Sequence, residues 1–216
     1  MKERGMIFNG EMVRAILEGR KTQTRRIMKV QPVLNGSFYE VYGAGWVTSM
    51  KSVPAIPGHS LASNCPFGLV GDRIWVRETW ADAGASAPDL KLYRANYPAH
   101  VPTHYENVPP VDEIRWTPSI HMPRWASRLT LEITGVRVER LNGISETDAE
   151  AEGIDMEALF DAQDCYDCIA DHNMTGRPTA TGAFKYLWES IYGEESWKSN
   201  PWVWVIEFKR IEGGEA

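Results

Sequence analysis

The sequence predicts a mixed α+β domain, a small β-barrel with helices packed beside it. Three segments alternate apolar and polar side chains as strands do, at residues 71–82, 129–141 and 200–211. Short helical patterns lie between them, at residues 9–19, 144–154 and 184–193. Because no repeat and no linker divides the chain into two cores, we expect a single domain over residues 1–216.

The composition narrows the classes of function. The chain is 43% hydrophobic with nine Trp, which is enough for a sizeable core, and its net charge of −6 argues against a general phosphate binder. No apolar run is long enough for a membrane span and the start lacks the pattern of a signal peptide, so we expect a cytoplasmic protein. Residues 1–30 nevertheless hold eight Lys/Arg against three Glu, which favours a local anionic or polar ligand over a long polyanion.

The first helix is predicted over NGEMVRAILEG, where Asn9 can cap the start and Gly19 can end it. Its apolar stripe is Met12, Val13, Ile16 and Leu17. Residues 30–70 follow, rich in Gly, Ser and Pro, and we expect a long loop or hairpin there.

The strand predicted in GDRIWVRETWAD places a carboxylate among apolar side chains, because Glu78 shares its face with Ile74, Val76 and Trp80. A buried charge is costly unless it is paired, so Glu78 should face a pocket or a cationic partner. Residues 84–127 hold seven of the 13 prolines and are expected to be irregular.

Regular structure is predicted to resume at LTLEITGVRVERL, where the alternation changes phase at Gly135, as at a β-bulge. A capping box from Ser145 to Asp148 opens the next helix, and Gly193 ends the helix in FKYLWESIYG. The closing strand has one apolar face, made by Trp202, Trp204, Ile206 and Phe208.

Three residues make up part of a possible zinc-binding pattern. Cys165 and Cys168 form a CYDC pair with His172 close by, but a structural zinc site needs four ligands and no second pair exists. We therefore expect neither a metal nor another cofactor.

The strongest candidate for chemistry is GRKTQTRR at residues 19–26. Lys21 and Thr24 are three apart, so in a helical turn or a tight loop their side chains can point the same way. A lysine can take the proton of a threonine hydroxyl if burial or the neighbouring Arg25 and Arg26 lower its pKa. Glu78 can orient such a lysine. The alternative is a solvated helix end, since cations favour a helix C-terminus.

Gly19, Lys21, Thr24 and Arg26 match G-x-K-x-x-T-x-R, and on this motif the chain resembles the ASCH domain family. GDRIWVRETW is similar to the family's second conserved strand, and the later helix and closing strand also fit. The resemblance spans residues 6–29, 68–81 and 116–210, and the chain looks most like the longer phage- and prophage-encoded members. Two insertions lie outside it, at about residues 30–67 and 82–115.

The resemblance implies a PUA-like β-barrel and a cleft, lined by the motif, that binds RNA or nucleotides. Some small members are amidohydrolases that remove the acetyl group of N(4)-acetylcytidine. For this chain that implies Thr24 as nucleophile, Lys21 as general base, Glu78 as the orienting acid/base and Arg26 as anion stabiliser. The remaining candidate ligand-binding residues are Gly19, Arg25, Arg77, Trp80, His121 and Arg124.

Two alternatives stay open beside hydrolysis. The first is a binding module that recognises RNA or a modified nucleotide without turnover. Its base would stack on aromatic residues, which can equally be core: Trp75, Trp80, Trp116 and Trp125. The second is a ribonuclease, for which His121 beside Arg124 is the candidate acid or base. The acidic total favours a small ligand in a pocket over a long polymer.

Overall fold

The computed structural model describes residues 1–41, 44–47, 52–53, 61–85, 87–161 and 179–211. Within these residues the chain is a mixed α and β protein, as the sequence predicts. The helices are α1 Gly10–Leu17, α2 Glu146–Ala151, α3 Met156–Asp161, α4 Ala180–Tyr192 and α5 Glu195–Lys198. The strands are β1 Glu3–Ile7, β2 Gln23–Ile27, β3 Val33–Asn35, β4 Phe38–Val41, β5 Ala44–Val47, β6 Ser52–Val53, β7 Arg73–Arg77, β8 Trp80–Asp82, β9 Lys91–Tyr93, β10 Thr130–Arg140 and β11 Trp202–Ile211.

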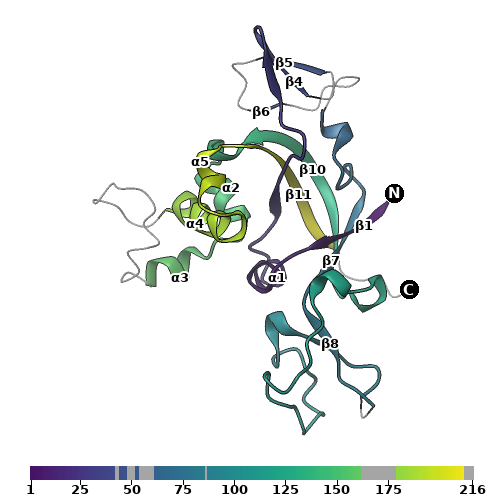
Figure 1. Ribbon diagram of the computed structural model, residues 1–216. Coiled ribbons are helices and arrows are strands. Elements are labelled where there is room, and N and C mark those ends of the chain that lie inside the picture. Colours follow the sequence, from purple (N-terminus) through teal and green to yellow (C-terminus); the bar gives the residue numbers. More distant parts are fainter. Residues whose placement is uncertain (42–43, 48–51, 54–60, 86, 162–178, 212–216) are drawn as a thin grey trace.

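The main sheet has the strand order β1-β7-β10-β11-β2, with β6 paired to β10. β1 and β7 run parallel, and the other pairs in this sheet are antiparallel. Figure 1 shows β10 and β11 as long curved strands that arch over α1, with α2, α4 and α5 grouped on one side. Among the described strands no pairing joins β1 to β2, so these two are the edges of the sheet.

Both faces of β11 are buried. As predicted, Trp202, Trp204, Ile206 and Phe208 share one face, where they join the core under α1, β1, β7 and β10. Val203 and Val205 point to the opposite face and pack against α2 and α4 in a second apolar cluster. A strand that is buried on both faces is expected to have a continuous apolar sequence, which agrees with WVWVI.

The predicted helix ends and the bulge are confirmed. Asn9 caps α1 by accepting from the Met12 amide, Ser145 caps α2 by accepting from the Asp148 amide, and α4 ends at Gly193. The pairing of β10 with β11 shifts register between Ile133 and Gly135.

The strand predicted over residues 71–82 is wrong in extent. β7 ends at Arg77, and Trp80 opens β8, which pairs with β9 in a separate ribbon. The chain leaves the main sheet at Glu78, whose amide donates to the Met122 Sδ atom and whose side chain is buried in an ion pair. Glu78 is therefore at a junction between two sheets.

The two predicted insertions contain short strands. In the first, β3, β4 and β5 form a three-stranded antiparallel sheet. The described part of the second contains β9, which pairs with β8 at the start of the insertion, and the 3-10 turn Arg94–Asn96. In Figure 1 these parts extend from opposite ends of the main sheet. No helix in the described ranges is long and apolar enough to span a membrane.

Candidate functional site

The GRKTQTRR segment forms a turn and an edge strand, not a helical turn. Gly19 has a φ of +79°, a left-handed conformation that reverses the chain after α1. β2 then pairs with β11, with Thr24 opposite Ile206. Because successive side chains of a strand alternate, Gln23 and Arg25 contact α2, whereas Thr24 and Arg26 lie on the side of β1.

Lys21 is a buried cation with a carboxylate partner. Its Nζ atom donates to the Glu152 backbone oxygen at 2.7 Å and to Glu152 Oε2 at 2.8 Å, and its side chain is 0% exposed. Burial lowers the pKa of Lys21, an effect that the charge of Glu152 opposes and the charges of Arg26 and Arg25 reinforce. This is the environment in which a lysine becomes a usable base.

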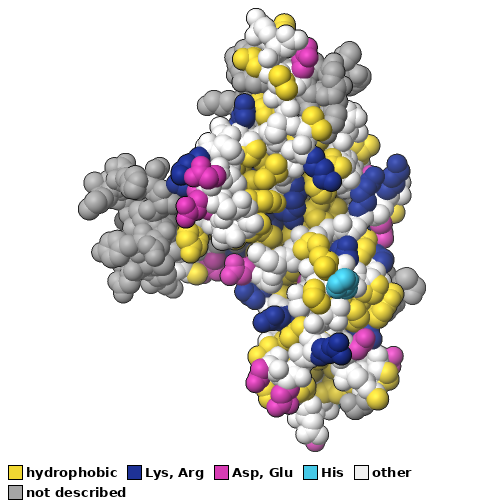
Figure 2. All heavy atoms as spheres, in the orientation of Figure 1, with side chains coloured by type: hydrophobic (Ala, Val, Ile, Leu, Met, Phe, Trp, Pro, Cys, Tyr) yellow, Lys and Arg dark blue, Asp and Glu magenta, His cyan; other side chains and the backbone are white. Residues whose placement is uncertain are grey.

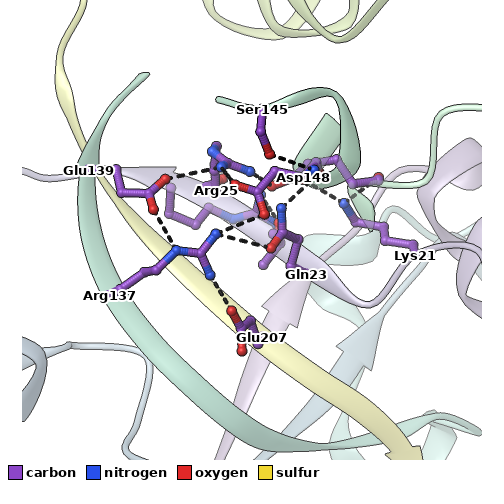
Figure 3. Close-up of polar contacts among 11 residues, drawn as sticks. Lys21, Gln23, Arg25, Arg137, Glu139, Ser145, Asp148 and Glu207 are labelled. Atoms are coloured by element: carbon purple, nitrogen blue, oxygen red, sulfur yellow. Dashed lines mark hydrogen bonds and ion pairs between the residues drawn. The ribbon is translucent and has the colours of Figure 1, made fainter. Parts of the chain in front are cut away.

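Arg25 is equally buried and contacts three carboxylates (Figure 3). Its guanidinium lies 3.1 Å from Glu152 Oε1, 3.1 Å from Asp148 Oδ2 and 3.2 Å from Glu139 Oε2. A buried arginine is tolerated where carboxylates balance its charge, and here the acidic partners come from β10, α2 and the residue after α2, although the Nε atom of Arg25 has no hydrogen-bond partner. The arrangement joins the edge strand β2 to those elements.

The network continues outward through Arg137. Arg137 lies 2.6 Å from Glu139 Oε1 and 3.0 Å from Asp148 Oδ1, and it also contacts Glu207. Burial acts to raise the pKa of Asp148, but the charges of Arg137 and Arg25 outweigh it and hold that pKa below its ordinary value. The cations Lys21, Arg25 and Arg137 are thus matched by acidic groups, which come from α2, the residue after α2, β10 and β11.

Arg26 is held differently. It donates to Thr24 Oγ1 at 2.8 Å and to the backbone oxygens of Arg25 and Ile7 at 3.0 Å each, and its guanidinium lies 5.3 Å from the centre of the Phe8 ring. Within the described part of the chain Arg26 makes no ion pair. It is a fixed charge held by neutral acceptors.

Arg25, Arg26 and Glu152 border a cavity of about 300 Å³ between α1, β2 and α4, which Lys21 and Thr24 do not line. Its residues are Ile7, Asn9, Met12, Arg25, Arg26, Glu152, Phe184, Leu187, Trp188, Ile191 and Tyr192. Near the centre of the face in Figure 2, dark blue cationic side chains lie among yellow hydrophobic ones, in the region between α4 and β7 of Figure 1. The cavity is apolar on the α4 side and polar toward β2.

Three aromatic side chains of α4 form the apolar wall. Phe184, Trp188 and Tyr192 are spaced by four residues, so they lie along one side of the helix. The rings of Trp188 and Tyr192 are 4.4 Å apart between centroids and tilted by 37°. Burial lowers the pKa of Arg26, and its interaction with the Tyr192 hydroxyl opposes that shift, so the wall and the cation adjoin. Phe184 and Trp188 are each 3% exposed and Tyr192 is 39% exposed, so Tyr192 is the ring of this wall on which a flat ligand can stack.

The sequence-predicted catalytic residues are not all together. Lys21 and Thr24 are close in the chain, but the Thr24 hydroxyl accepts from Arg26 and Lys21 donates to Glu152. Glu78 pairs with Arg128, with both oxygens at 2.9 Å. The expectation that Glu78 meets a cationic partner is confirmed, and that partner is Arg128.

The other predicted binding residues divide into two groups. Arg25 and Arg26 line the cavity, and Gly19 shapes the turn that leads to them. The remaining four do not line it: Arg77, Trp80, His121 and Arg124. Trp80 is buried against Trp125, His121 is exposed, and Arg124 pairs with Glu3 at 3.0 Å.

Sequence reasoning missed Glu152 and the aromatic wall. Glu152 directly follows α2, whose acidic residues match no motif beyond the capping box, but Asp148 and Glu152 are four residues apart and therefore share a helix face. Both meet Arg25 in the structure. The spacing of Phe184, Trp188 and Tyr192 was visible as well, although core packing explains such a pattern equally well.

Nothing in the described ranges suggests a metal centre. No group of three His, Cys, Asp or Glu side chains there is arranged to hold a metal ion. Cys165, Cys168 and His172 lie outside the described residues.

Comparison with protein-family models, with curated proteins and with solved structures found no significant match to this chain. A functional assignment therefore depends on the residues of the site and on the resemblance of the GRKTQTRR segment.

Proposed function

We propose that this chain is an ASCH-type protein that binds a nucleobase or nucleoside in the cavity between α1, β2 and α4. The observation that carries the proposal is the pairing of an aromatic wall with Arg26, a guanidinium that makes no ion pair with a described carboxylate. Bases are held by stacking on aromatic rings and by hydrogen bonds to their polar edges. The N–H groups of a guanidinium suit the acceptors of such an edge.

The proposal includes a PUA-like fold. It is supported by a strongly curved sheet with α1 on its inner side (Figure 1) and by the contact between the two edge strands, in which Arg26 of β2 donates to the Ile7 oxygen of β1. This hydrogen bond brings the two edges of the curved sheet close together, as in a partly open barrel.

The second candidate is hydrolysis of an acyl group from a modified cytidine, favoured by the buried Lys21. In this reaction the Thr24 hydroxyl attacks the acyl carbonyl, neutral Lys21 accepts its proton, and that proton passes to the leaving amine. Water then hydrolyses the Thr24 ester. Glu152, which contacts Lys21, takes the orienting role that the resemblance gives to Glu78. Neither Lys21 nor Thr24 lines the cavity, so the reaction requires the acyl group to reach them and Thr24 to exchange its contact with Arg26 for one with Lys21.

Binding is tested with free cytidine, uridine, adenosine and N(4)-acetylcytidine, by calorimetry and by tryptophan fluorescence. We expect saturable binding that weakens about tenfold or more in Tyr192→Ala and in Arg26→Met, because base stacking contributes ~1–3 kcal/mol. The matched control is Tyr186→Ala, an exposed tyrosine of the same helix that does not line this cavity. Absence of binding to every nucleoside, or binding by the two cavity variants equal to that of the wild type, would refute the proposal.

Hydrolysis is tested by chromatography of N(4)-acetylcytidine after incubation with the wild type and with Lys21→Met. In this variant Glu152 keeps its ion pair with Arg25, and circular dichroism checks the fold. Turnover that disappears in the variant while binding remains supports the reaction. Binding without turnover in the wild type rejects hydrolysis and leaves the binding function.

A further inference from the structure

A second surface, separate from the cavity, lies on the outer face of β1 and β7. Alternate residues of β7 are fully buried, and the side chains between them point to the opposite face: Arg73, Trp75 and Arg77. β1 runs parallel beside this row, with Gly5 next to Trp75 and Ile7 next to Arg77.

Gly5 allows the Trp75 indole to lie against the β1 backbone. A Cβ atom at Gly5 would be only 2.6 Å from Trp75 Cζ2 and 2.9 Å from the Arg77 Cδ atom, so no larger residue fits without displacing both side chains. The Arg77 guanidinium lies 5.4 Å from the Trp75 ring centre. The face therefore carries an indole and a guanidinium packed close to the strand.

Two cations of this face form no ion pair within the described part of the chain, although the pKa of Glu3, the neighbour of Arg73 on β1, is lowered by its hydrogen bond with Arg124 and further by the charges of Arg124 and Arg73. Neither Arg73 nor Arg77 makes an ion pair with any described residue, and the Nε atom of each is buried without a hydrogen-bond partner. Arg77 donates to the Ile120 backbone oxygen. The flanking carboxylates are already paired, Glu3 with Arg124 at 3.0 Å and Glu132 with Lys209 at 2.9 Å.

The face is thus locally positive although the chain as a whole has a net charge of −6. Guanidinium groups without an ion-pair partner attract phosphates, and a flat aromatic surface accepts unstacked bases.

We infer that a single-stranded nucleic acid binds across the outer face of β1 and β7. A base stacks on Trp75 or on the guanidinium plane of Arg77, and Arg73 and Arg77 contact the backbone phosphates. Sheet faces that present an aromatic ring between basic side chains are suited to single strands, whose bases are free to stack. Ile7 both borders this face and lines the cavity, so a bound strand passes beside the cavity.

The test is fluorescence anisotropy with labelled eight-nucleotide single strands of RNA and of DNA, measured over a range of salt concentrations. We expect salt-dependent binding by the wild type. Arg73→Gln/Arg77→Gln should weaken it at least tenfold and reduce the salt slope by about 1 for each phosphate that the protein no longer neutralises. Trp75→Leu should weaken it about tenfold with a smaller change in slope.

The matched control is Lys29→Gln/Lys198→Gln, which removes two exposed positive charges away from β1 and β7. It should bind the strands as the wild type does. No binding by the wild type at low salt, or equal weakening by the control pair, overturns the inference. Nucleoside binding in the cavity is measured on the same variants and should be unchanged, so the two proposals fail separately.

Discussion

At the residue scale, the Glu152 carboxylate accepts on both oxygens, from Arg25 on Oε1 and from Lys21 on Oε2. All three side chains are almost inaccessible to solvent. A buried ion pair contributes little net stability, but removing one partner leaves the others charged and unpaired. Loss of Glu152 should therefore lower the free energy of unfolding more than loss of any other member of the network.

We predict that Glu152→Gln lowers the free energy of unfolding by about 3 kcal/mol. The amide can still accept one hydrogen bond, but it cannot balance the charges of Lys21 and Arg25. Urea unfolding followed by circular dichroism measures the change. Glu150→Gln, at an exposed residue of α2, is the control and should shift stability by less than about 0.5 kcal/mol. Equal effects in the two variants would contradict this account of the network.

The residues of the site differ in how far the sequence predicted them. Lys21, Thr24, Arg25 and Arg26 are adjacent in the chain, so their motif could be found without a structure. Glu152 meets them only because the isolated bridge between Lys21 and Glu152 brings segments 131 residues apart together. No local pattern specifies a contact of that kind.

At the element scale, Gly19 sets the reversal from α1 into β2. Its φ of +79° is in the left-handed region, and a Cβ atom built there would meet no other atom within 4 Å. A substitution at Gly19 therefore changes backbone strain alone. The turn determines which side chains of β2 face α2 and which face β1.

We predict that Gly19→Ala costs about 1 kcal/mol of stability, since L-residues are strained in this conformation by that amount. Gly143→Ala is the matched control, because its Cβ also meets open space and its φ is not in the left-handed region. Thermal unfolding of both variants provides the comparison. A loss at Gly143 as large as that at Gly19 would show that something other than backbone strain is responsible.

Helix ends and the bulge could be predicted because the residues at those positions determine them locally. The caps at Asn9 and Ser145, the end at Gly193 and the bulge at Gly135 all follow from side-chain or glycine preferences. The break after Arg77 was missed because the alternation continues through Glu78 to Trp80, which is buried in a different sheet. Periodicity gives the spacing of buried side chains but not the sheet that buries them.

At the scale of the whole molecule, the β8–β9 ribbon meets the main sheet at a buried ion pair. Arg128 makes two contacts of 2.9 Å with Glu78, donates to Asn96 Oδ1 at 2.9 Å and lies 4.1 Å from the centre of the Tyr93 ring. The pair thus contacts both the β7–β8 junction and the segment after β9. Glu78 has two possible roles, as this attachment point or as the acid/base implied by the resemblance.

We predict that Glu78→Gln loosens the ribbon while leaving the cavity intact. Loss of the buried carboxylate leaves Arg128 unpaired and should cost about 3 kcal/mol. Hydrogen exchange, measured by mass spectrometry, should increase mainly in residues 80–100, while nucleoside affinity stays within about twofold of the wild type. Glu132→Gln, whose partner Lys209 is exposed, is the control and should change neither quantity. If instead nucleoside binding or hydrolysis is lost and hydrogen exchange in the ribbon is unchanged, Glu78 acts as the acid/base of the site, and its ion pair with Arg128 does not hold the ribbon in place.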